Sequence, residues 1–264
     1  MRNIKMLCCA IGATLLSATA YAQDLSNDMV TNAVSMLNRP YVAHVLDQDS
    51  QENLVINTDD LDCVTFVEYT IAMSLTPKDE NSDQDEGVFA NYVQKLRYRN
   101  GEINGYSSRM HYITDWINNA VKQGLLQDVT DYQSTYTTTA HAGYMTSHVS
   151  EYPQLAASAS EVAKMKDIEA AIDGTEYKYI PKQYVPNEGY PWIKDGDIIV
   201  ITSNANGLDV AHMGIAFNIS KKLTLIHASQ KEGKVEASHY TLNKLLSDNN
   251  TWTGIRVLRA VPQN

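Results

Sequence analysis

The chain has 264 residues, of which 21 are basic and 31 are acidic, and its formal net charge is −10. This sign argues against binding to nucleic acid, because phosphate contacts need a basic face, and against adhesion to anionic lipid. No apolar run in the sequence is long enough to span a bilayer.

The N-terminus has the pattern of an export signal. Arg2 and Lys5 form a basic segment, residues 6–16 are mostly apolar, and 20–22 (Ala-Tyr-Ala) match a small-x-small cleavage site. We predict that residues 1–22 are removed between Ala22 and Gln23, and that the protein is periplasmic or extracellular. An uncleaved anchor is the alternative, which the short apolar run disfavours. The mature residues, 23–264, are enough for a single catalytic domain with one core.

The cysteine count singles out one thiol. Of the three cysteines, Cys8 and Cys9 leave with the predicted signal, and both precede its apolar stretch, where a lipid-modified cysteine is not expected. Cys63 is then the one thiol of the mature chain. A lone thiol in an oxidising compartment is buried and inert, paired with another molecule, or used for chemistry.

The first part of the mature chain has mainly helical patterns. Apolar residues at helical spacing predict a helix over 26–37 and a second one that starts after Asp62 and ends before Pro77. An acidic polar loop is expected at 78–87. Further helices are predicted over 88–98, 111–123 and 155–172. Residues 131–147 are rich in Tyr and Thr and have no clear period, so we expect a loop or short strands there.

The last third of the chain has strand patterns instead. Apolar runs predict strands over 198–201, 211–219, 223–228, 235–239 and 255–259. Residues 220–222 form a short turn between the second and third of these, which predicts an antiparallel hairpin. Helices followed by a small antiparallel sheet indicate the α+β class.

Cys63 lies in the first turn of the helix that Asp62 can cap. Backbone N–H groups and the positive dipole end at a helix start favour the thiolate and lower its pKa. The thiolate is the nucleophilic form, and the same N–H groups can hold an oxyanion. Asp60 and Asp62 flank the thiol and oppose its ionisation unless they point away. The alternative interpretation is a small buried residue at a helix start.

Two of the seven histidines lie on the predicted hairpin. With the turn at 220–222, His212 and His227 are cross-strand neighbours to within one pair. Adjacent strands are about 5 Å apart, so one imidazole can hydrogen-bond to the other and orient it. A base and an orienting residue are what a cysteine nucleophile needs. Each histidine taken alone fits a structural role in a strand equally well.

Four segments resemble the NlpC-type papain-like cell-wall hydrolases. They are 62–68 (DCVTFVE), 196–199 (GDII), 212–216 (HMGIA) and 226–229 (IHAS). That family orders its site as a cysteine at a helix start, a histidine on a strand, and a polar residue, often histidine, on the next strand. The resemblance implies a papain-like core in which Cys63 is the nucleophile, His212 the base and His227 the orienting residue.

Further segments resemble one branch of this family, the N-acetylmuramoyl-L-alanine amidase-like proteins. They are 39–43 (RPYVA), 97–101 (RYRNG), 108–112 (SRMHY) and 207–212 (GLDVAH). The branch implies hydrolysis of peptidoglycan or muropeptides between N-acetylmuramic acid and L-alanine, with neither a cofactor nor a metal. We also expect a helical insertion over about 80–185 that shapes the substrate cleft. Val64 replaces a serine of the commoner NlpC motif, which weighs against the commoner cleavage between D-glutamate and a diamino acid.

Five further residues are candidates for substrate binding, namely Tyr41, Arg109, His111, Tyr112 and Asp209. The arginine and the histidine suit a peptide carboxylate or the lactyl oxygen of muramic acid. The tyrosines can line a cleft, and the aspartate can orient groups near the base. Structural alternatives are as good: Tyr112 has helical spacing with apolar neighbours and fits a core, and Asp209 fits a turn.

Three rival functions stay open on the sequence. His212, His227 and Asp209 could be ligands of a zinc-dependent amidase, although the chain lacks an HExxH motif. A non-catalytic cell-wall binding module and the D-glutamyl endopeptidase of the same fold are the other two. Replacement of Cys63 separates the zinc enzyme and the binding module from a cysteine hydrolase, because a binding module keeps its affinity and a metal enzyme is blocked by chelators instead. The endopeptidase would share the thiol mechanism and differs in its products, which are cut after D-glutamate.

Overall fold

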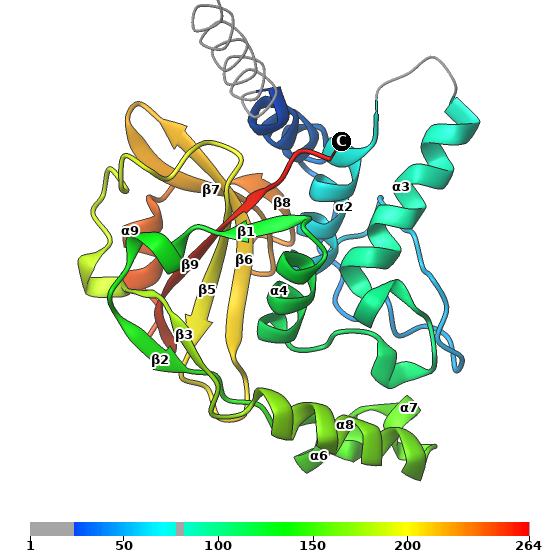
Figure 1. The fold of residues 1–264 in the computed structure, drawn as a ribbon. Helices are drawn as coiled ribbons and strands as arrows, with labels where there is room; N and C mark the ends of the chain where they lie inside the picture. Colours follow the sequence, from blue (N-terminus) through cyan, green and yellow to red (C-terminus); the bar gives the residue numbers. More distant parts are fainter. Residues whose placement is uncertain (1–23, 78–81, 264) are drawn as a thin grey trace, which may run out of the picture.

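A computed structural model describes residues 24–77 and 82–263 of the chain. The predicted export signal, with Cys8 and Cys9, lies outside these residues. Helices pack beside one large sheet, and a group of helices within residues 144–172 lies below it in the view of Figure 1. Within the described ranges, no helix is long and apolar enough to cross a membrane.

The large sheet has seven strands, and every pairing within it is antiparallel. Its order is β1-β9-β5-β6-β7-β8, with β4 paired to β9. The bounds are β1 Leu126–Asp128, β4 Ile180–Pro181, β5 Ile198–Ser203, β6 Val210–Ile219, β7 Lys222–Ser229, β8 Lys234–Ala237 and β9 Trp252–Ala260. β2 (Thr137–Thr139) and β3 (Glu176–Lys178) form a separate pair. The five predicted strands and the α+β class are confirmed, whereas β1, β3 and β4 are too short to leave a period.

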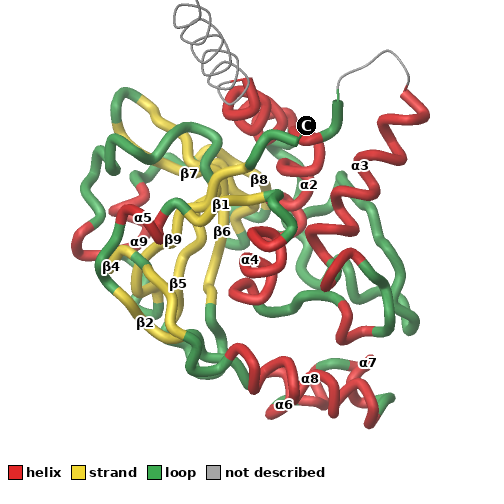
Figure 2. The backbone as a smooth tube through the Cα atoms, viewed as in Figure 1, coloured by secondary structure: helices red, strands yellow, loops and turns green. Residues whose placement is uncertain are grey.

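The helices surround this sheet and are drawn in red in Figure 2. The first covers residues 24–35. The others are α2 Cys63–Leu75, α3 Ser82–Arg97, α4 Ile113–Lys122, α5 Thr130–Gln133, α6 Tyr144–Ser147, α7 Pro153–Ala156, α8 Ala159–Ile172 and α9 Leu242–Ser247, with four short 3-10 turns at Arg99–Gly101, Tyr106–Ser108, Val149–Glu151 and Lys182–Tyr184. The helix predicted over 155–172 is split, because the Ser158 hydroxyl accepts the Glu161 N–H and starts α8 there. The loop predicted at 78–87 is wrong from Ser82 onward, where α3 begins.

Strand β5 is buried on both faces, as its continuous apolar run predicts. Ile198 and Val200 belong to the cluster that contains residues of α2 and α4. Ile199 and Ile201 belong to a second cluster on the opposite face, which includes residues of α9. Figure 1 shows α2 and α4 on one side of the sheet and α9 on the other. The sheet is therefore the middle layer of the fold. Its packing against α2 fixes where the strands lie relative to this helix.

The predicted hairpin of β6 and β7 is confirmed, with a turn of two residues rather than three. Ser220 and Lys221 both have positive φ, 51° and 64°, and Ile219 pairs with Lys222. A turn with two positive φ angles matches the twist of the flanking strands. This turn sets the cross-strand register on which the two histidines depend.

Residues 80–185, predicted to form a helical insertion, contribute strands as well as helices. Helices α3 to α8 lie within this segment, but β1 and β4 pair with β9 in the large sheet. A third apolar cluster, separate from both faces of the sheet, includes Met145, Leu155 and Met165 of α6, α7 and α8. Part of the segment is thus integral to the sheet, and another part, with helices α6, α7 and α8, forms a separate apolar cluster.

Candidate active site

Cys63 is the first residue of α2, and Asp62 fixes this helix start. The Asp62 Oδ1 atom accepts the N–H groups of Val64 at 3.0 Å and Thr65 at 2.8 Å, while the Asp62 N–H donates to Thr65 Oγ1 at 2.9 Å. This capping box uses N–H groups that a helix start otherwise leaves free. The Cys63 side chain is held half-buried against the main apolar cluster.

The Cys63 thiol is neutral at pH 7, which corrects the prediction of a lowered pKa. Burial raises the pKa of Cys63 to about 12, and the Asp62 carboxylate raises it further, against the opposing effect of the N–H groups of Met213, Cys63 and Val64. Asp60 points elsewhere and accepts from Asn57 Nδ2 at 3.1 Å. A neutral thiol needs a base that removes its proton during attack.

Tyr41 lies beside this thiol. A parallel bridge between Tyr41 and Leu61, in which the Val42 N–H donates to the Leu61 carbonyl at 3.0 Å, brings residue 41 to the start of α2. Burial raises the pKa of Tyr41 to about 12, and the nearby Cys63 and Asp62 add to this effect. The Tyr41 hydroxyl therefore keeps its proton at pH 7 and remains a hydrogen-bond donor next to Cys63.

His212 and His227 are in contact across the hairpin. The distance from His212 Nε2 to His227 Nδ1 is 2.7 Å, and the ring planes meet at 80°. Burial lowers the pKa of His212 to about 3 and that of His227 to about 4, and each imidazole also lies beside the other. The N–H of Met213, next in the chain after His212, faces the Cys63 thiol. The structure thus brings the two predicted histidines into contact and places the strand that carries His212 beside the Cys63 thiol.

A bulge and a glycine position the two imidazoles. The pairing of β5 with β6 shifts between Ile201 and Thr202, so that Ile201 pairs with His212 and Thr202 with Val210. Bulges commonly redirect side chains beside active sites. A Cβ atom added at Gly214 would lie 2.9 Å from the His227 Cβ and 2.9 Å from the Ile226 carbonyl oxygen. Residue 214 must therefore be glycine for His227 to keep this position.

Two residues that the sequence did not single out complete this part of the site. Trp252 stacks on His212 with ring centroids 5.8 Å apart and planes at 9°. The Glu236 Oε1 atom lies 3.7 Å from His227 Nε2. Both line a pocket of about 340 Å³ together with His212 and His227. The sequence could have indicated Glu236 if the predicted strand over 235–239 had been paired antiparallel with the one over 223–228, because that register places Glu236 opposite His227.

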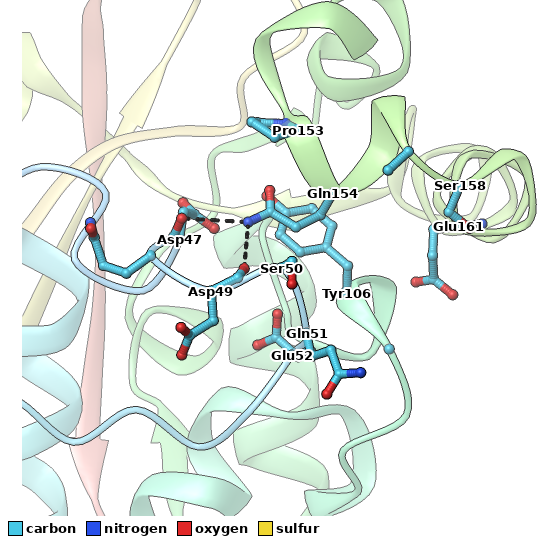
Figure 3. A pocket seen from close by; sticks show the side chains of 13 residues that line it. Asp47, Asp49, Ser50, Gln51, Glu52, Tyr106, Pro153, Gln154, Ser158 and Glu161 are labelled. Carbon is cyan, nitrogen blue, oxygen red and sulfur yellow. Dashed lines mark hydrogen bonds between the residues drawn. The ribbon is translucent and has the colours of Figure 1, made fainter.

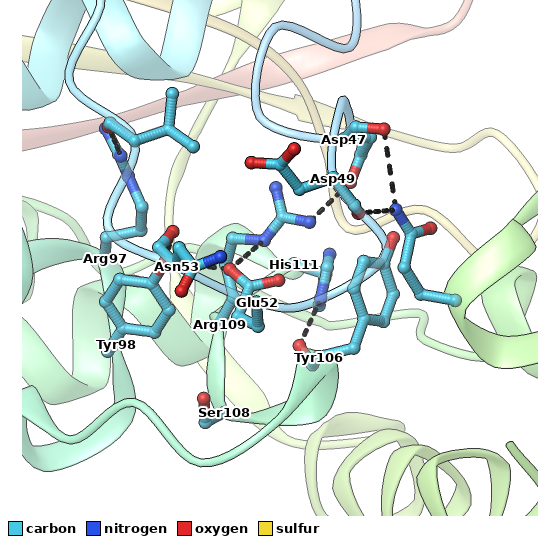
Figure 4. Close-up of polar contacts among 12 residues, drawn as sticks. Asp47, Asp49, Glu52, Asn53, Arg97, Tyr98, Tyr106, Ser108, Arg109 and His111 are labelled. Atoms are coloured by element: carbon cyan, nitrogen blue, oxygen red, sulfur yellow. Dashed lines mark hydrogen bonds and ion pairs between the residues drawn. The ribbon is translucent and has the colours of Figure 1, made fainter.

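Arg109 and His111 both have polar partners within the protein, which Figure 4 shows. The Arg109 guanidinium forms ion pairs with Asp47 and with Glu52 Oε1, the latter at 3.1 Å, and only 7% of its side chain is exposed. His111 Nε2 lies 3.0 Å from the Tyr106 carbonyl oxygen, and burial lowers the pKa of His111 to about 3. The predicted role of Arg109 in carboxylate binding is therefore not supported, because two protein carboxylates already hold it.

Tyr112 and Asp209 have structural partners away from the histidines. Tyr112 is buried, and its hydroxyl donates to Glu169 at 2.7 Å. The buried Asp209 Oδ2 accepts the Thr114 N–H at 2.5 Å at the start of α4. The zinc ligand set predicted as an alternative is thus not assembled, and no three metal-ligating side chains meet within the described part of the chain.

Three neighbouring pockets extend from the histidines along the surface. Gln230 lines both the histidine pocket and a second one of about 310 Å³, which Tyr41, Asp62 and Arg109 also line. Asp47 is shared between this second pocket and a third of about 690 Å³. Figure 3 shows the third pocket between the 47–52 loop and helices α7 and α8, where Gln154 Nε2 donates to the Asp49 carbonyl at 3.1 Å. Shared lining residues therefore link the three pockets to one another.

Comparison with known families identifies the group to which this site belongs. The model of the N-acetylmuramoyl-L-alanine amidase-like (AmiA-like) family matches residues 32–255, a range that includes Cys63, His212 and His227. The chain belongs to the N-acetylmuramoyl-L-alanine amidase-like family. The amidase-like assignment is the coarser part of the resemblance seen in the sequence, and it is confirmed. None of the curated proteins matches the chain.

Solved structures agree with this amidase-like assignment. A structure of an N-acetylmuramoyl-L-alanine amidase from Bacteroides uniformis is 55% identical, with a TM-score of 0.85, and the match covers 88% of this chain and 98% of that one. A Bacteroides fragilis protein whose suggested activity is xylanase is 48% identical, with a TM-score of 0.84 and coverage of 87% and 99%. A Legionella pneumophila protein of 18% identity and TM-score 0.65, covering 94% and 96%, shares the fold.

Proposed function

We propose that this protein hydrolyses the amide bond between N-acetylmuramic acid and L-alanine in peptidoglycan or in muropeptides, with Cys63, His212 and His227 as its catalytic residues on a papain-like core of the NlpC type. The observation that carries the proposal is the 2.7 Å contact between the imidazoles of His212 and His227. His212 directly precedes Met213, whose N–H faces the Cys63 thiol. Export of the chain after cleavage near Ala22 would bring it to this substrate.

The proposed acylation step uses a neutral thiol. As the sulfur of Cys63 bonds to the lactyl carbonyl carbon, its proton passes to Nδ1 of His212, because Nε2 of His212 is engaged by His227. The carbonyl oxygen becomes an oxyanion, for which the Tyr41 hydroxyl is a donor beside the thiol. His212 then gives the proton to the alanine nitrogen, the C–N bond breaks, and a thioester and a free peptide remain.

The second half of the cycle releases the sugar. Water gives a proton to His212 as its oxygen attacks the thioester carbon. The C–S bond breaks, the proton held by His212 returns to the Cys63 sulfur, and the lactyl carboxylic acid that forms loses its own proton to solvent. Both halves need one imidazole that accepts and returns a proton at the same nitrogen, and the contact with His227 favours a fixed orientation of that ring.

The test is mass spectrometry of defined muropeptides after digestion. With N-acetylmuramoyl-tetrapeptide, free peptide that begins with L-alanine is the expected product, and chelator leaves the rate unchanged. Products cut after D-glutamate would identify the endopeptidase instead, and cleavage of xylan would support the activity suggested for the Bacteroides fragilis protein. Cys63→Ala should abolish cleavage, whereas retained affinity without any wild-type cleavage would indicate a binding module.

A further inference from the structure

Glu236 is the nearest charged group to the outer nitrogen of the histidine pair. It lies on β8 directly opposite His227 of β7 in the antiparallel register. Its Oε1 atom is 3.7 Å from His227 Nε2, and 7% of the His227 side chain and 17% of the Glu236 side chain are exposed. His227 Nε2 is buried and has no hydrogen-bond partner among the described residues. Water has little access to this nitrogen, so the carboxylate is the acceptor within reach.

The contact between the two imidazoles allows two arrangements of protons. Because burial lowers the pKa of both imidazoles, each ring is neutral at pH 7 and carries one proton. In the first arrangement His212 Nε2–H donates to His227 Nδ1, and the His227 proton is on Nε2. In the second His227 Nδ1–H donates to His212 Nε2, and the His212 proton is on Nδ1.

Only the first arrangement supports attack by Cys63. It leaves Nδ1 of His212 without a proton, so this nitrogen can accept the proton of the thiol. The second arrangement fills Nδ1 and removes the base. The 2.7 Å distance is the same in both, so the contact between the imidazoles does not choose between them.

We propose that Glu236 is a positioning residue that selects the productive tautomer, by accepting a hydrogen bond from His227 Nε2–H. The second arrangement would point the unprotonated Nε2 of His227 at the carboxylate, which is unfavourable. The distance of 3.7 Å is longer than a hydrogen bond, and catalytic hydrogen bonds are often long before substrate binds. This inference rests on the proposed chemistry of Cys63 and His212.

The charged surroundings of Glu236 offer a matched control. Glu232 lies near it and lines the same pocket, together with Lys231, and 46% of the Glu232 side chain is exposed. His239 and Lys234 also influence the Glu236 carboxyl. Replacement of Glu232 removes one negative charge from this pocket without touching His227, so it separates a general charge effect from tautomer selection.

The experiment combines kinetics with nitrogen-15 NMR of the imidazoles at pH 7.5. Glu236→Ala should lower kcat about tenfold with KM within twofold, and should shift the His227 resonances from Nε2 protonation toward a mixture. Glu236→Asp should recover part of kcat, and Glu232→Gln should keep the His227 tautomer of the wild type. Circular dichroism melts confirm that each variant is folded.

Wild-type kcat and an unchanged His227 tautomer in Glu236→Ala would overturn the proposal. An equal shift of the His227 resonances in Glu232→Gln would overturn it as well, because charge alone would then be responsible. The NMR measurement needs no substrate. If the wild type fails to cleave muropeptides, the proposed function fails, and the tautomer of His227 still decides the role of Glu236.

Discussion

The Nε2 atom of His212 lies 2.7 Å from the Nδ1 atom of His227, and Trp252 stacks on His212. His212 is therefore held by an aromatic face and by one hydrogen bond to a second imidazole. Its remaining nitrogen, Nδ1, is the one available to a reaction. This arrangement makes the rate sensitive to residues that do not themselves meet the substrate.

His227→Ala should lower kcat about 100-fold and change KM by less than twofold, because general base catalysis contributes factors of this order. His227→Asn keeps a side-chain oxygen that can accept from His212, so it should lose less. Steady-state kinetics on an N-acetylmuramoyl-tetrapeptide measures both variants. A wild-type kcat in His227→Ala would contradict the orienting role.

The rate should be nearly independent of pH over a wide range. Burial lowers the pKa of His212 to about 3 and of His227 to about 4, so both imidazoles are neutral above about pH 5. Burial raises the pKa of Cys63 to about 12, so the thiol keeps its proton throughout the range up to about pH 9. The acid limb of kcat/KM is thus expected below pH 5.

The measurement is kcat/KM against pH for the wild type, with circular dichroism at each pH to confirm that the protein is folded. Between about pH 5 and 9 the profile should vary by less than threefold. A narrow bell centred near pH 7 would instead indicate a thiolate–imidazolium pair in the free enzyme and contradict the neutral pair inferred from burial.

Gly214→Ala should damage the site through sterics alone. The added methyl would lie 2.9 Å from the His227 Cβ and from the Ile226 carbonyl, so His227 or its strand must shift. We expect a loss of about 1–3 kcal/mol in the free energy of unfolding, as for other overpacked positions, and at least a tenfold loss of kcat.

Gly87→Ala is the control, because an added Cβ there meets nothing within 4 Å on helix α3. It should stabilise the fold by about 0.5–1 kcal/mol. Urea unfolding and kinetics check both, and wild-type kcat in Gly214→Ala would refute the requirement for glycine.

Local patterns were sufficient to predict the elements that carry the candidate catalytic residues. Asp62 before an apolar periodic run located the start of α2, and two strands around a short turn located His212 near His227 on the neighbouring strand. Both features depend on interactions between residues near in sequence, namely a helix cap and a hairpin register. They can therefore be predicted from a single sequence.

Features that depend on distant contacts were not predictable. Arg109 is paired with Asp47 and Glu52, more than 50 positions earlier in the chain, and nothing local indicates these partners. The pKa of Cys63 depends on burial against the main apolar cluster, which outweighs the effect of the N–H groups at the helix start. A side chain's charge type was readable from the sequence, but its partner and its solvent exposure were not.

The final prediction concerns Arg109, whose two ion pairs hold the loop that lines the second and third pockets. Arg109→Lys keeps the charge but loses the planar fork that reaches both Asp47 and Glu52. We expect KM to rise about fivefold with kcat within twofold, because the loop loosens while the thiol and imidazoles stay in place, and a loss of about 1–3 kcal/mol in unfolding free energy. Arg99→Lys is the control, since the Arg99 side chain is 30% exposed and pairs with Asp115 outside these pockets. Kinetics and urea unfolding measure both variants. A fall in kcat with unchanged KM would place Arg109 in the chemistry rather than in the architecture of the loop.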